Sequence, residues 1–308
     1  MIRVKYQAMG CSMEALVDHE GSHALKLLEQ VPAWFEEWEQ VFSRFRPDSD
    51  LNKLNRSAGK DFPAVPTLIK VLQAALGEAR WTDGLVVPTI RESLEIAGYD
   101  RDFDLISPVQ PGKTTSEKRT DLPDWRQIAI DEPNQSIFLP AGMALDLGGF
   151  AKGWAAHQAM QRLGEIGPAL MDAGGDIAIS GPQADGQPWL VDIADPLQVQ
   201  ESLDMLALNG CGVATSGIDH RRWLQGDVLK HHIIDPRSGE AAQTDLVSVT
   251  VIAPDVIQAE AAAKAVLILG SQQGLEWLED RSEICGLLAL QDGRLLYSHD
   301  IKKYLWSV

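Results

Sequence analysis

The segment ALDLGGFAKGWAAH, residues 144–157, has the residue types of an anion-binding loop that leads into a helix. Gly148 and Gly149 lack a Cβ atom, so a ligand can approach their backbone closely. An alanine-rich helix is expected over residues 150–163, and its first turn would direct unpaired N–H groups and a positive dipole end at that ligand. Lys152 lies in the same turn. The segment therefore predicts a site for an anion or a diphosphate, with a glycine-tightened turn and a solvated lysine as the equal alternative.

The helix expected over residues 256–269 carries a second candidate pair. Apart from Gln258, its only polar side chains are Glu260 and Lys264, which lie four residues apart and therefore share one face. A helix that is apolar on nearly all sides is normally buried. Buried charges must be paired or must serve a function. The pattern thus favours a buried or functional pair over an exposed ion pair.

Three further polar motifs favour structural roles. Asp172 and Asp176 flank a Gly-Gly corner, where they could cap backbone amides or line a site. His231 and His232 are adjacent on an expected strand, so they point to opposite faces and cannot bind one metal ion together. In VATSGIDHRRW, residues 213–223, no Ser-His-Asp arrangement can be assigned.

The composition is that of a soluble globular protein, with 45% hydrophobic and 23% charged residues in a chain of 308. Asp and Glu number 44 against 27 Lys and Arg, a net charge of −17. This balance argues against a nucleic-acid scaffold, whose affinity comes largely from cationic contacts to phosphate. It remains compatible with a small phosphorylated ligand that is held locally. The three cysteines have no Cys-x-x-Cys spacing, so neither a zinc site nor a disulfide framework is expected.

No segment predicts passage through a membrane. The sequence has no apolar run of about 18 residues or more, so no transmembrane helix is expected. Its first residues lack the cationic and apolar segments of a secretory signal. We therefore expect a cytoplasmic protein, or a periplasmic one if a leader has been removed.

Helical and strand patterns interleave without strict alternation, which predicts an α+β fold with a mixed or antiparallel sheet and helical layers. The expected helices span about 22–42, 49–54, 68–79, 150–163, 255–269 and 272–281. The expected strands span about 6–17 with a break at Met9-Gly10, 128–130, 136–139, 168–172, 176–180, 189–194, 212–215, 230–234 and 246–253, with a last pair near 284–297. No clean linker is visible, so residues 1–308 are expected to form one compact unit with lobes and an exposed excursion at about 100–126.

Eight motifs, in their order and spacing, resemble those of the FAD:protein FMN transferases, the ApbE flavin transferases. They are AMGCSM, FSRFRPDSDLNKLN, WTDGLVVPTI, LDLGGFAKGW, DAGGDIAISG, ATSGIDHRR, HHIIDPRSG and SVTVIAPDVIQAEAAAKAVLILG, and they cover most of the chain. The resemblance implies the family's α+β architecture and the binding of FAD and a magnesium ion. It also implies transfer of the FMN half of FAD onto a threonine hydroxyl of an acceptor protein, with release of AMP.

The resemblance assigns roles to individual residues. The residues that it places on FAD are Met9, Phe45, Leu85, Val86, Val87, Asp146, Lys152 and Ile234. The carbonyl of Gly149 would face the metal ion, and Asn55 would lie near the acceptor. Phe45 stands where the family often has tyrosine, and Val87 stands where it commonly has aspartate. One hydroxyl and one carboxylate of the family pattern are therefore lost.

The chain departs from the family at two magnesium ligands. Where the family has an aspartate and, four residues later, a threonine, this chain has Glu260 and Lys264. Glutamate can still ligate a hard cation, but a charged lysine cannot. We hypothesise that the Lys264 ammonium takes the place of the metal and neutralises the diphosphate, which leaves Gly149 and Glu260 as an incomplete magnesium site. The expected catalytic residues are Asp146, which would position the ligand, and Lys152 and Lys264, which would stabilise the reacting phosphorus.

Three functions are compatible with these residues. The first is FMN transfer to a partner protein that bears a threonine acceptor motif. The second is a catalytically degraded homologue that only binds FAD. The third is a FAD diphosphatase, in which water replaces the acceptor hydroxyl and the products are AMP and FMN. No stretch of this chain resembles the acceptor pattern Asp-Gly-x-Thr/Ser-Gly-Ala-Thr, so self-flavinylation is not expected.

Overall fold

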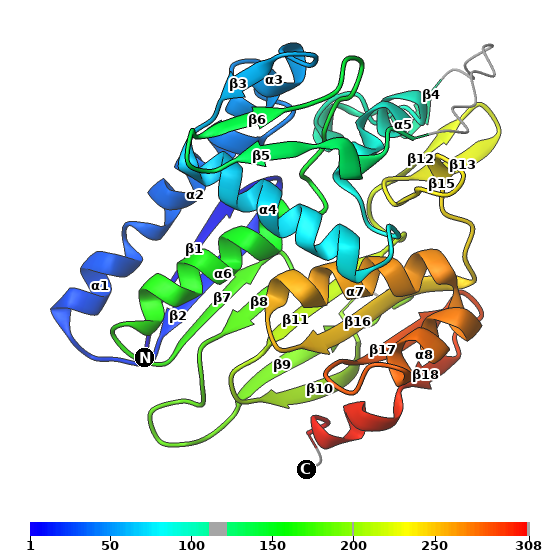
Figure 1. Cartoon of the computed structure of the whole chain (residues 1–308). Coiled ribbons are helices and arrows are strands. Elements are labelled where there is room, and N and C mark those ends of the chain that lie inside the picture. Colours follow the sequence, from blue (N-terminus) through cyan, green and yellow to red (C-terminus); the bar gives the residue numbers. More distant parts are fainter. Residues whose placement is uncertain (111–121, 199, 307–308) are drawn as a thin grey trace. The chain divides into compact units, whose positions relative to one another are not determined.

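The computed structural model describes residues 1–110, 122–198 and 200–306. Internal contacts divide the chain into two compact units (Figure 1). Unit 1 comprises residues 1–36, 152–219 and 244–308, and unit 2 comprises residues 37–151 and 220–243. One domain over the whole chain stays a prediction. The exposed excursion expected at about 100–126 falls in part on residues 111–121, which lie outside the described residues.

Unit 1 is built on an eight-stranded antiparallel sheet in the order β1-β2-β7-β8-β11-β16-β17-β18. Its strands are β1 (Ile2–Ala8), β2 (Cys11–Val17), β7 (Ala169–Ala173), β8 (Ile177–Ile179), β11 (Gly212–Gly217), β16 (Leu246–Ala253), β17 (Cys285–Leu290) and β18 (Leu295–Tyr297). In β2 every second residue, Met13, Ala15 and Val17, is buried, as the two-residue period of a strand requires. All eight residues of β16 are buried, so the centre of the sheet is covered on both faces.

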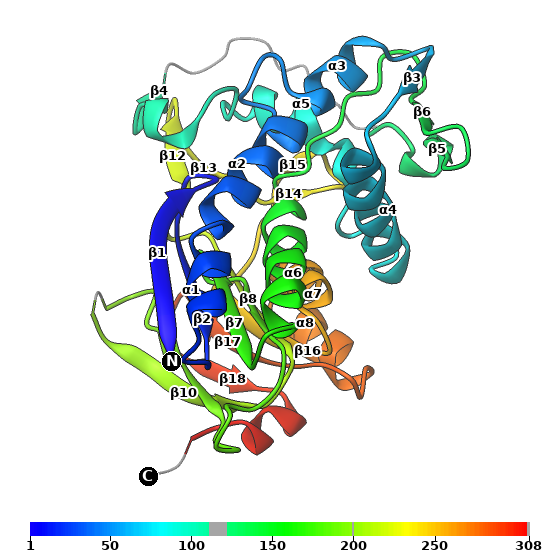
Figure 2. The same ribbon diagram turned by 90° about the vertical axis from the view of Figure 1, so that its left-hand side faces the viewer.

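The helices of unit 1 include α6 and α7, which lie side by side over the sheet (Figures 1 and 2). The helical elements are α1 (Ser22–Leu28), the start of α2 (Val31–Phe42), α6 (Ala151–Gly164), α7 (Val256–Leu269), α8 (Ser271–Glu279) and the 3-10 helix η4 (His299–Lys303). A Cβ atom on Gly212 would lie 2.0 Å from the backbone nitrogen of Val256, so β11 passes directly against the start of α7. A hairpin of β9 (Trp189–Ala194) and β10 (Ser202–Leu208) packs on the sheet through a core that includes Leu206, Leu208 and Ile252.

Unit 2 combines short helices with three small sheets. Its helical elements are the end of α2, α3 (Asp50–Arg56), α4 (Pro66–Trp81), α5 (Arg91–Ile96) and the 3-10 helices η1 (Pro88–Ile90), η2 (Phe103–Leu105) and η3 (Trp125–Gln127). The sheets are β3-β6-β5, β13-β12-β4 and β14-β15. Their strands are β3 (Asp61–Pro63), β4 (Val109–Gln110), β5 (Ala129–Asp131), β6 (Ser136–Phe138), β12 (Arg222–Gln225), β13 (Val228–His231), β14 (Ile234–Asp235) and β15 (Glu240–Ala241). A core of Leu94, Tyr99, Trp223 and Ile234 joins residues that are far apart in the sequence.

The α+β fold and most of the expected elements are confirmed. Ser49 caps α3 as expected, because its side chain accepts a hydrogen bond from the Asn52 amide. The helix expected around residues 68–79 is α4, and the chain leaves it through Asp83 and Gly84, both with positive φ. The expected helices near the C-terminal end are α7 and α8.

Two expected elements are wrong in the same way, because each is broken in two. The helix expected over 22–42 is interrupted between Leu28 and Val31, where Pro32 follows. Proline lacks an N–H group and clashes with the preceding helical turn, so one continuous helix cannot form there. The strand expected over 230–234 divides into β13 and β14. The Ile233 amide, which would have to join the ladder, donates instead to Nδ1 of His231 at 3.3 Å.

His231 is buried and uses both ring nitrogens. Nε2 lies 2.9 Å from the Ala242 carbonyl oxygen, while Nδ1 accepts from Ile233, so the neutral imidazole donates through Nε2. Burial lowers the pKa of His231, and Lys230 lowers it further, while the bond to Ala242 opposes the shift. The two hydrogen bonds and the lowered pKa therefore both favour the neutral form of His231.

We expect this histidine to make the protein less stable in acid. The unfolded chain protonates His231 near pH ~6.5, whereas the folded chain resists protonation. The contribution of neutral His231 to the stability of the fold is thus fully present above about pH 6.5, and it is lost as the pH falls through the pKa of His231 in the folded chain. Urea unfolding between about pH 7.5 and about pH 5.5 should show His231→Gln losing roughly 1 kcal/mol less than the parent. Equal losses in the two proteins would contradict this role.

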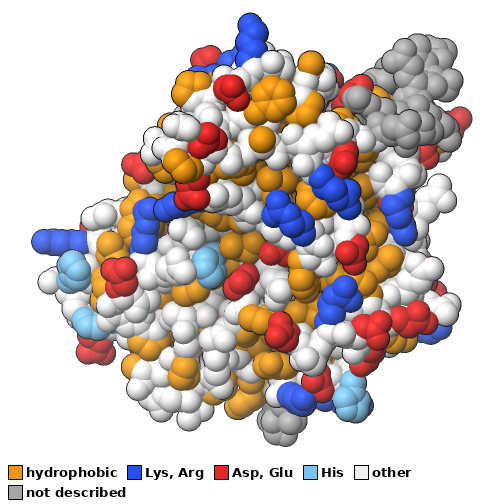
Figure 3. Space-filling model, viewed as in Figure 1, with side chains coloured by type: hydrophobic (Ala, Val, Ile, Leu, Met, Phe, Trp, Pro, Cys, Tyr) orange, Lys and Arg blue, Asp and Glu red, His pale blue; other side chains and the backbone are white. Residues whose placement is uncertain are grey.

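Acidic and basic side chains are interspersed over the face drawn in Figure 3. On this face the acidic side chains, which outnumber the basic ones in the chain and give it a net charge of −17, are therefore mixed with Lys and Arg. Among the helices of the described residues, none is both long enough and apolar enough to cross a bilayer.

Candidate active site

A buried ion pair joins Arg44 and Asp146 in unit 2. Nε of Arg44 lies 2.7 Å from Oδ2 of Asp146, and each side chain is only 5% exposed. The other carboxylate oxygen accepts the Gly148 amide at 2.8 Å. The Asp146 amide donates to the Pro88 carbonyl at 2.8 Å, so the backbone of this residue is fixed as well. Asp146 is therefore fully engaged within the protein and holds Arg44 in place.

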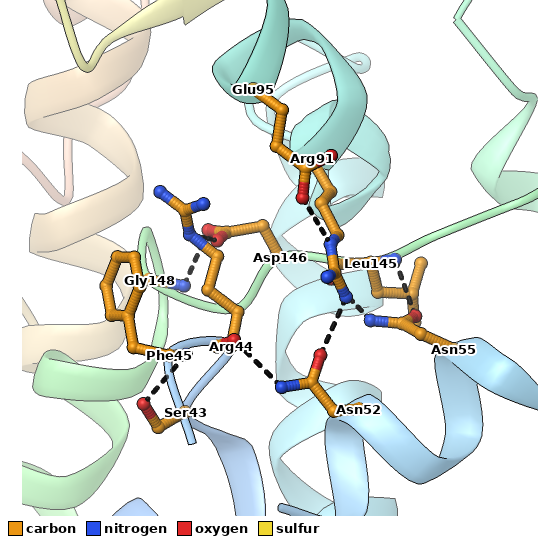
Figure 4. Close-up of polar contacts among 10 residues, drawn as sticks. All are labelled: Ser43, Arg44, Phe45, Asn52, Asn55, Arg91, Glu95, Leu145, Asp146 and Gly148. Atoms are coloured by element: carbon orange, nitrogen blue, oxygen red, sulfur yellow. Dashed lines mark hydrogen bonds and ion pairs between the residues drawn. The ribbon is translucent and has the colours of Figure 1, made fainter. Parts of the chain in front are cut away.

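Two asparagines of α3 tie the surrounding loops together (Figure 4). Nδ2 of Asn52 donates to the carbonyls of Arg44 at 2.8 Å and Arg46 at 2.9 Å, while its Oδ1 accepts from Arg91 at 2.8 Å. The side-chain amide of Asn55 bonds the backbone of Leu145 in both directions, at 3.0 and 2.8 Å. These contacts position the residues on either side of the Arg44–Asp146 pair.

The Arg44 guanidinium also lies against two aromatic rings. Its central carbon is 4.3 Å from the ring centroid of Phe45 and 4.5 Å from that of Tyr99, within the range of cation–π attraction. Phe45 keeps 37% of its surface exposed. Nη2 of Arg44 is buried and has no hydrogen-bond partner in the described part of the chain. Nη2 of Arg44 is therefore a hydrogen-bond donor that no protein group among the described residues satisfies.

Four charged side chains of unit 1, Lys152, Asp176, Glu260 and Lys264, form a second group, which we call the charged cluster. Lys152, in the first turn of α6, forms an ion pair with Asp176 and lies 3.8 Å from Oε1 of Glu260. Nζ of Lys264 lies 3.0 Å from the same oxygen, one turn along α7. The two carboxylates are 2% exposed, whereas Lys152 keeps 17% and Lys264 keeps 13% of its side chain accessible. The lysine side chains are therefore the only members of the cluster that are not fully buried.

The carboxylates fix the charge of Lys152. Burial by itself lowers the pKa of a lysine, but Asp176 and Glu260 outweigh it, and the pKa of Lys152 is raised. Burial raises the pKa of Glu260, and the ammonium groups of Lys264 and Lys152 oppose that rise. Lys152 therefore stays cationic throughout the physiological pH range.

Glu260 also engages the first turn of α6. Its Oε2 accepts the Gly153 amide at 3.0 Å, so a carboxylate of the protein occupies one of the helix-terminal donors that the sequence offered to a ligand. A Cβ atom at residue 153 would lie 2.6 Å from that oxygen. Glycine at this position therefore allows α6 and α7 to approach closely enough for the cluster to form.

We expect Gly153→Ala to destabilise the protein by about 1–3 kcal/mol, because the added methyl group must displace a buried carboxylate. Urea unfolding measures the loss. Gly77→Ala is the matched control, since α4 leaves nothing within 4 Å of the added Cβ, and it should stabilise by about 0.5–1 kcal/mol. If the two substitutions change stability equally, the close contact at Gly153 is not what constrains this position.

A glycine corner places Asp176 in the cluster. Gly174 and Gly175 have φ values of 70° and 93°, which favour glycine, and a Cβ on Gly174 would lie 2.7 Å from that of Cys11. Oδ1 of Asp172 accepts the Gly175 amide at 2.7 Å. The structural role expected for this corner is confirmed for Asp172, while Asp176 has the additional task of pairing Lys152.

Comparison with known proteins gives the family. The ApbE family profile matches residues 9–288. The chain is 31% identical over 294 residues to the FAD:protein FMN transferase of Treponema pallidum, and the alignment covers 89% of this chain and 80% of that protein. The chain belongs to the ApbE family. A second relative is the FAD:protein FMN transferase of Salmonella typhimurium, 26% identical over 270 residues and matched over 85% of this chain and 76% of its own length.

Solved structures of ApbE proteins share the fold. The crystal structure of the ApbE protein from Thermotoga maritima aligns with a TM-score of 0.87 at 24% identity and covers 99% of both chains. The flavin transferase ApbE from Vibrio cholerae aligns with a TM-score of 0.81 at 22% identity, again over 99% of both chains. The expected ApbE-like α+β architecture is thereby confirmed.

The residues that the ApbE resemblance assigned to FAD differ widely in exposure. Phe45 is exposed, and Leu85 and Met9 are partly buried, with Met9 at positive φ in the β1–β2 turn. Three are buried at 3–6% exposure, namely Val86, Val87 and Ile234. Asn55 is committed to Leu145, so its assignment to the acceptor remains a prediction. Gly149, in the loop before α6, is partly buried.

The residues present do not fit the magnesium ion that the ApbE resemblance implied. In the described parts of the chain, no three His, Cys, Asp or Glu side chains are grouped so as to hold a metal ion. Oε1 of Glu260 lacks a well-aligned hydrogen bond, but Lys264 lies 3.0 Å and Lys152 lies 3.8 Å from it. A magnesium ion would have to approach this oxygen to about 2.0–2.1 Å, into the space of one ammonium group and against two positive charges.

Sequence reasoning missed two of the residues that organise these sites. Arg44 lies between Phe42 and Phe45 in the motif FSRFRP, and a cation flanked by two aromatic residues was the available signal. Asp176 was seen only as part of a glycine corner. Its partner Lys152 lies 24 residues earlier, a distance at which spacing predicts no contact.

Proposed function

We propose that this chain is a FAD:protein FMN transferase and that its charged cluster binds the diphosphate of FAD. The observation that carries the proposal is the ion pairing of Lys152, which keeps the ammonium group of this partly exposed side chain charged in the first turn of α6. Membership of the ApbE family supports the same activity. Phosphoryl transfer at a diphosphate needs charge neutralisation and alignment more than a reactive protein nucleophile.

The proposed reaction exchanges one phosphorus–oxygen bond for another. The threonine Oγ of an acceptor protein attacks the phosphorus that carries the FMN half of FAD. The bond from that phosphorus to the bridging oxygen breaks, and AMP leaves with the bridging oxygen. The hydroxyl proton is released to water. The products are a threonine–FMN phosphoester and AMP.

Each part of the chain has a task in this reaction. Lys152 and Lys264 stabilise the negative charge that builds up on the phosphoryl oxygens. Asp146 acts as a positioning residue, since it holds Arg44, whose unpartnered Nη2 can donate to an oxygen of FAD. Phe45 and Leu85 offer apolar surface to the flavin or the adenosine. No step is assigned to a magnesium ion, and Asn55 is kept as the candidate contact for the acceptor.

The test is to incubate the purified chain with FAD and a peptide that contains the pattern Asp-Gly-x-Thr/Ser-Gly-Ala-Thr. Intact-mass spectrometry of the peptide should show a gain of one FMN less one water, with one AMP released for each transfer. A peptide whose last threonine is replaced by alanine should gain nothing.

Two outcomes would refute the transferase and would identify what replaces it. AMP and FMN formed at the same rate with and without the peptide would make the protein a FAD diphosphatase. FAD that binds but stays intact would make it a FAD-binding protein. Neither outcome bears on where the diphosphate binds.

A further inference from the structure

We propose that the Lys264 ammonium performs the charge neutralisation of a divalent cation, so that this chain binds and uses FAD without any divalent metal. The inference rests on the proposed function and specifies which cation neutralises the diphosphate at that site. It is an ammonium group of the protein itself, so FAD binding does not depend on the supply of metal. Glu260 does not fit a magnesium ion, because two ammonium groups lie within 4 Å of its Oε1.

The position of Lys264 is fixed by its own helix. Its Nζ contacts Oε1 of Glu260 at 3.0 Å and the Glu260 carbonyl oxygen at 3.4 Å. Glu260 in turn is fixed by the Gly153 amide through Oε2. On α7 the residues that follow Glu260 and Lys264, Ala261 and Ala265, are fully buried. The Lys264 side chain therefore leaves the helix through a packed environment. The ammonium is thus held at a defined place beside Lys152.

The charge balance of the cluster explains why a metal is not needed. Two lysines and two carboxylates sum to zero, so FAD meets a neutral cluster that contains two ammonium groups instead of a net negative one. With threonine at residue 264, the sum would be −1, and the doubly negative diphosphate would require a bound cation. Lysine is a compact point charge that pairs well with phosphate.

The same balance predicts that a divalent cation is repelled. An ion on Glu260 would raise the charge of the cluster to +2 and would lie against two ammonium groups. The expected consequence is that the parent protein neither binds Mn²⁺ at this site nor changes its FAD affinity when magnesium is removed.

The experiment measures FAD binding by fluorescence quenching in EDTA and in magnesium buffer, for the parent and for the double variant Glu260→Asp, Lys264→Thr. The dissociation constant of the parent should change less than about twofold between the two buffers. That of the double variant should weaken at least about tenfold in EDTA and recover in magnesium, the effect of one charge-assisted contact. Lys264→Arg keeps the charge and should remain independent of metal.

Lys303→Thr is the matched control. It removes a lysine that pairs with Asp300 at 2.8 Å but is 67% exposed, and it should leave metal dependence unchanged. Mn²⁺ titration followed by electron paramagnetic resonance, without FAD, is a readout that does not depend on activity. The double variant should bind Mn²⁺, and the parent should not. Thermal unfolding checks that each variant is folded.

The outcomes separate this inference from the proposed function. A parent that binds FAD only with magnesium, or that binds Mn²⁺ on Glu260, overturns the inference and leaves the transferase standing. A parent that binds FAD in neither buffer overturns both. A folded double variant that binds FAD and metal as the parent does also overturns the inference. If the double variant is unfolded, the parent's FAD and Mn²⁺ titrations decide alone.

Discussion

Replacing Lys152 by methionine is expected to slow FMN transfer by about 10²–10³-fold, the usual effect of removing one preorganised charge from a reacting centre. Lys152 is the one member of the charged cluster that contacts both carboxylates, and its raised pKa keeps it cationic. Single-turnover transfer to the acceptor peptide, followed by intact mass, measures the loss. Because methionine keeps much of the lysine stem, the apolar packing of α6 should change little.

The same substitution is expected to destabilise the protein, and a second variant separates the two effects. Lys152→Met leaves the Asp176 carboxylate buried without its cation, which costs about 3–5 kcal/mol. Adding Asp176→Asn removes that buried charge, so the double variant should regain most of the stability in urea unfolding. It should not regain the rate of transfer. A double variant that recovers both would mean that Lys152 serves the fold and not the reaction.

Replacing Arg44 by methionine is expected to be the second large perturbation. Asp146, which is 5% exposed, would keep its hydrogen bond from the Gly148 amide but would lose its cation. The loss should lower the free energy of unfolding by about 3–5 kcal/mol. FAD binding should weaken as well, because the unpartnered Nη2 is lost together with the contact to Phe45. Urea unfolding and FAD fluorescence titration measure the two effects.

Arg46→Met is the control for Arg44→Met. Its guanidinium pairs with Glu39 at 3.2 Å, but both side chains are more than a fifth exposed, so its loss should cost less than about 1 kcal/mol. Its carbonyl, which Asn52 binds, is kept in the variant. If Arg44→Met and Arg46→Met are equally mild, the buried ion pair does not organise this part of unit 2.

The sequence allowed the local features of both sites to be predicted, because those features follow from short spacing. Glu260 and Lys264 share a face of an apolar helix, and they form an ion pair in which Glu260 is buried and Lys264 is 13% exposed. Lys152 follows the glycine loop in the first turn of α6, as expected. In these cases helical geometry alone brings the groups together.

Contacts between distant segments could not be predicted in this way. Arg44 and Asp146 are separated by 102 residues, and Gly153 meets Glu260 across 107 residues. Nothing in a helical or strand period relates such positions, so the occupation of the Gly148 loop amide by Asp146 and of the Gly153 helix amide by Glu260 was not foreseen. The break before α2 comes from the missing N–H group of Pro32, and the break between β13 and β14 comes from the Ile233 amide, which donates to His231. Hydrophobic periodicity does not detect the state of a single backbone amide.

Binding of the FAD diphosphate by the two lysines without a metal ion is tested most directly by a crystal structure of the protein grown with FAD and magnesium. Diphosphate oxygens should lie within hydrogen-bond distance of Nζ of both Lys152 and Lys264, and no metal ion should lie on Glu260. FAD bound with its diphosphate away from both ammonium groups would contradict it.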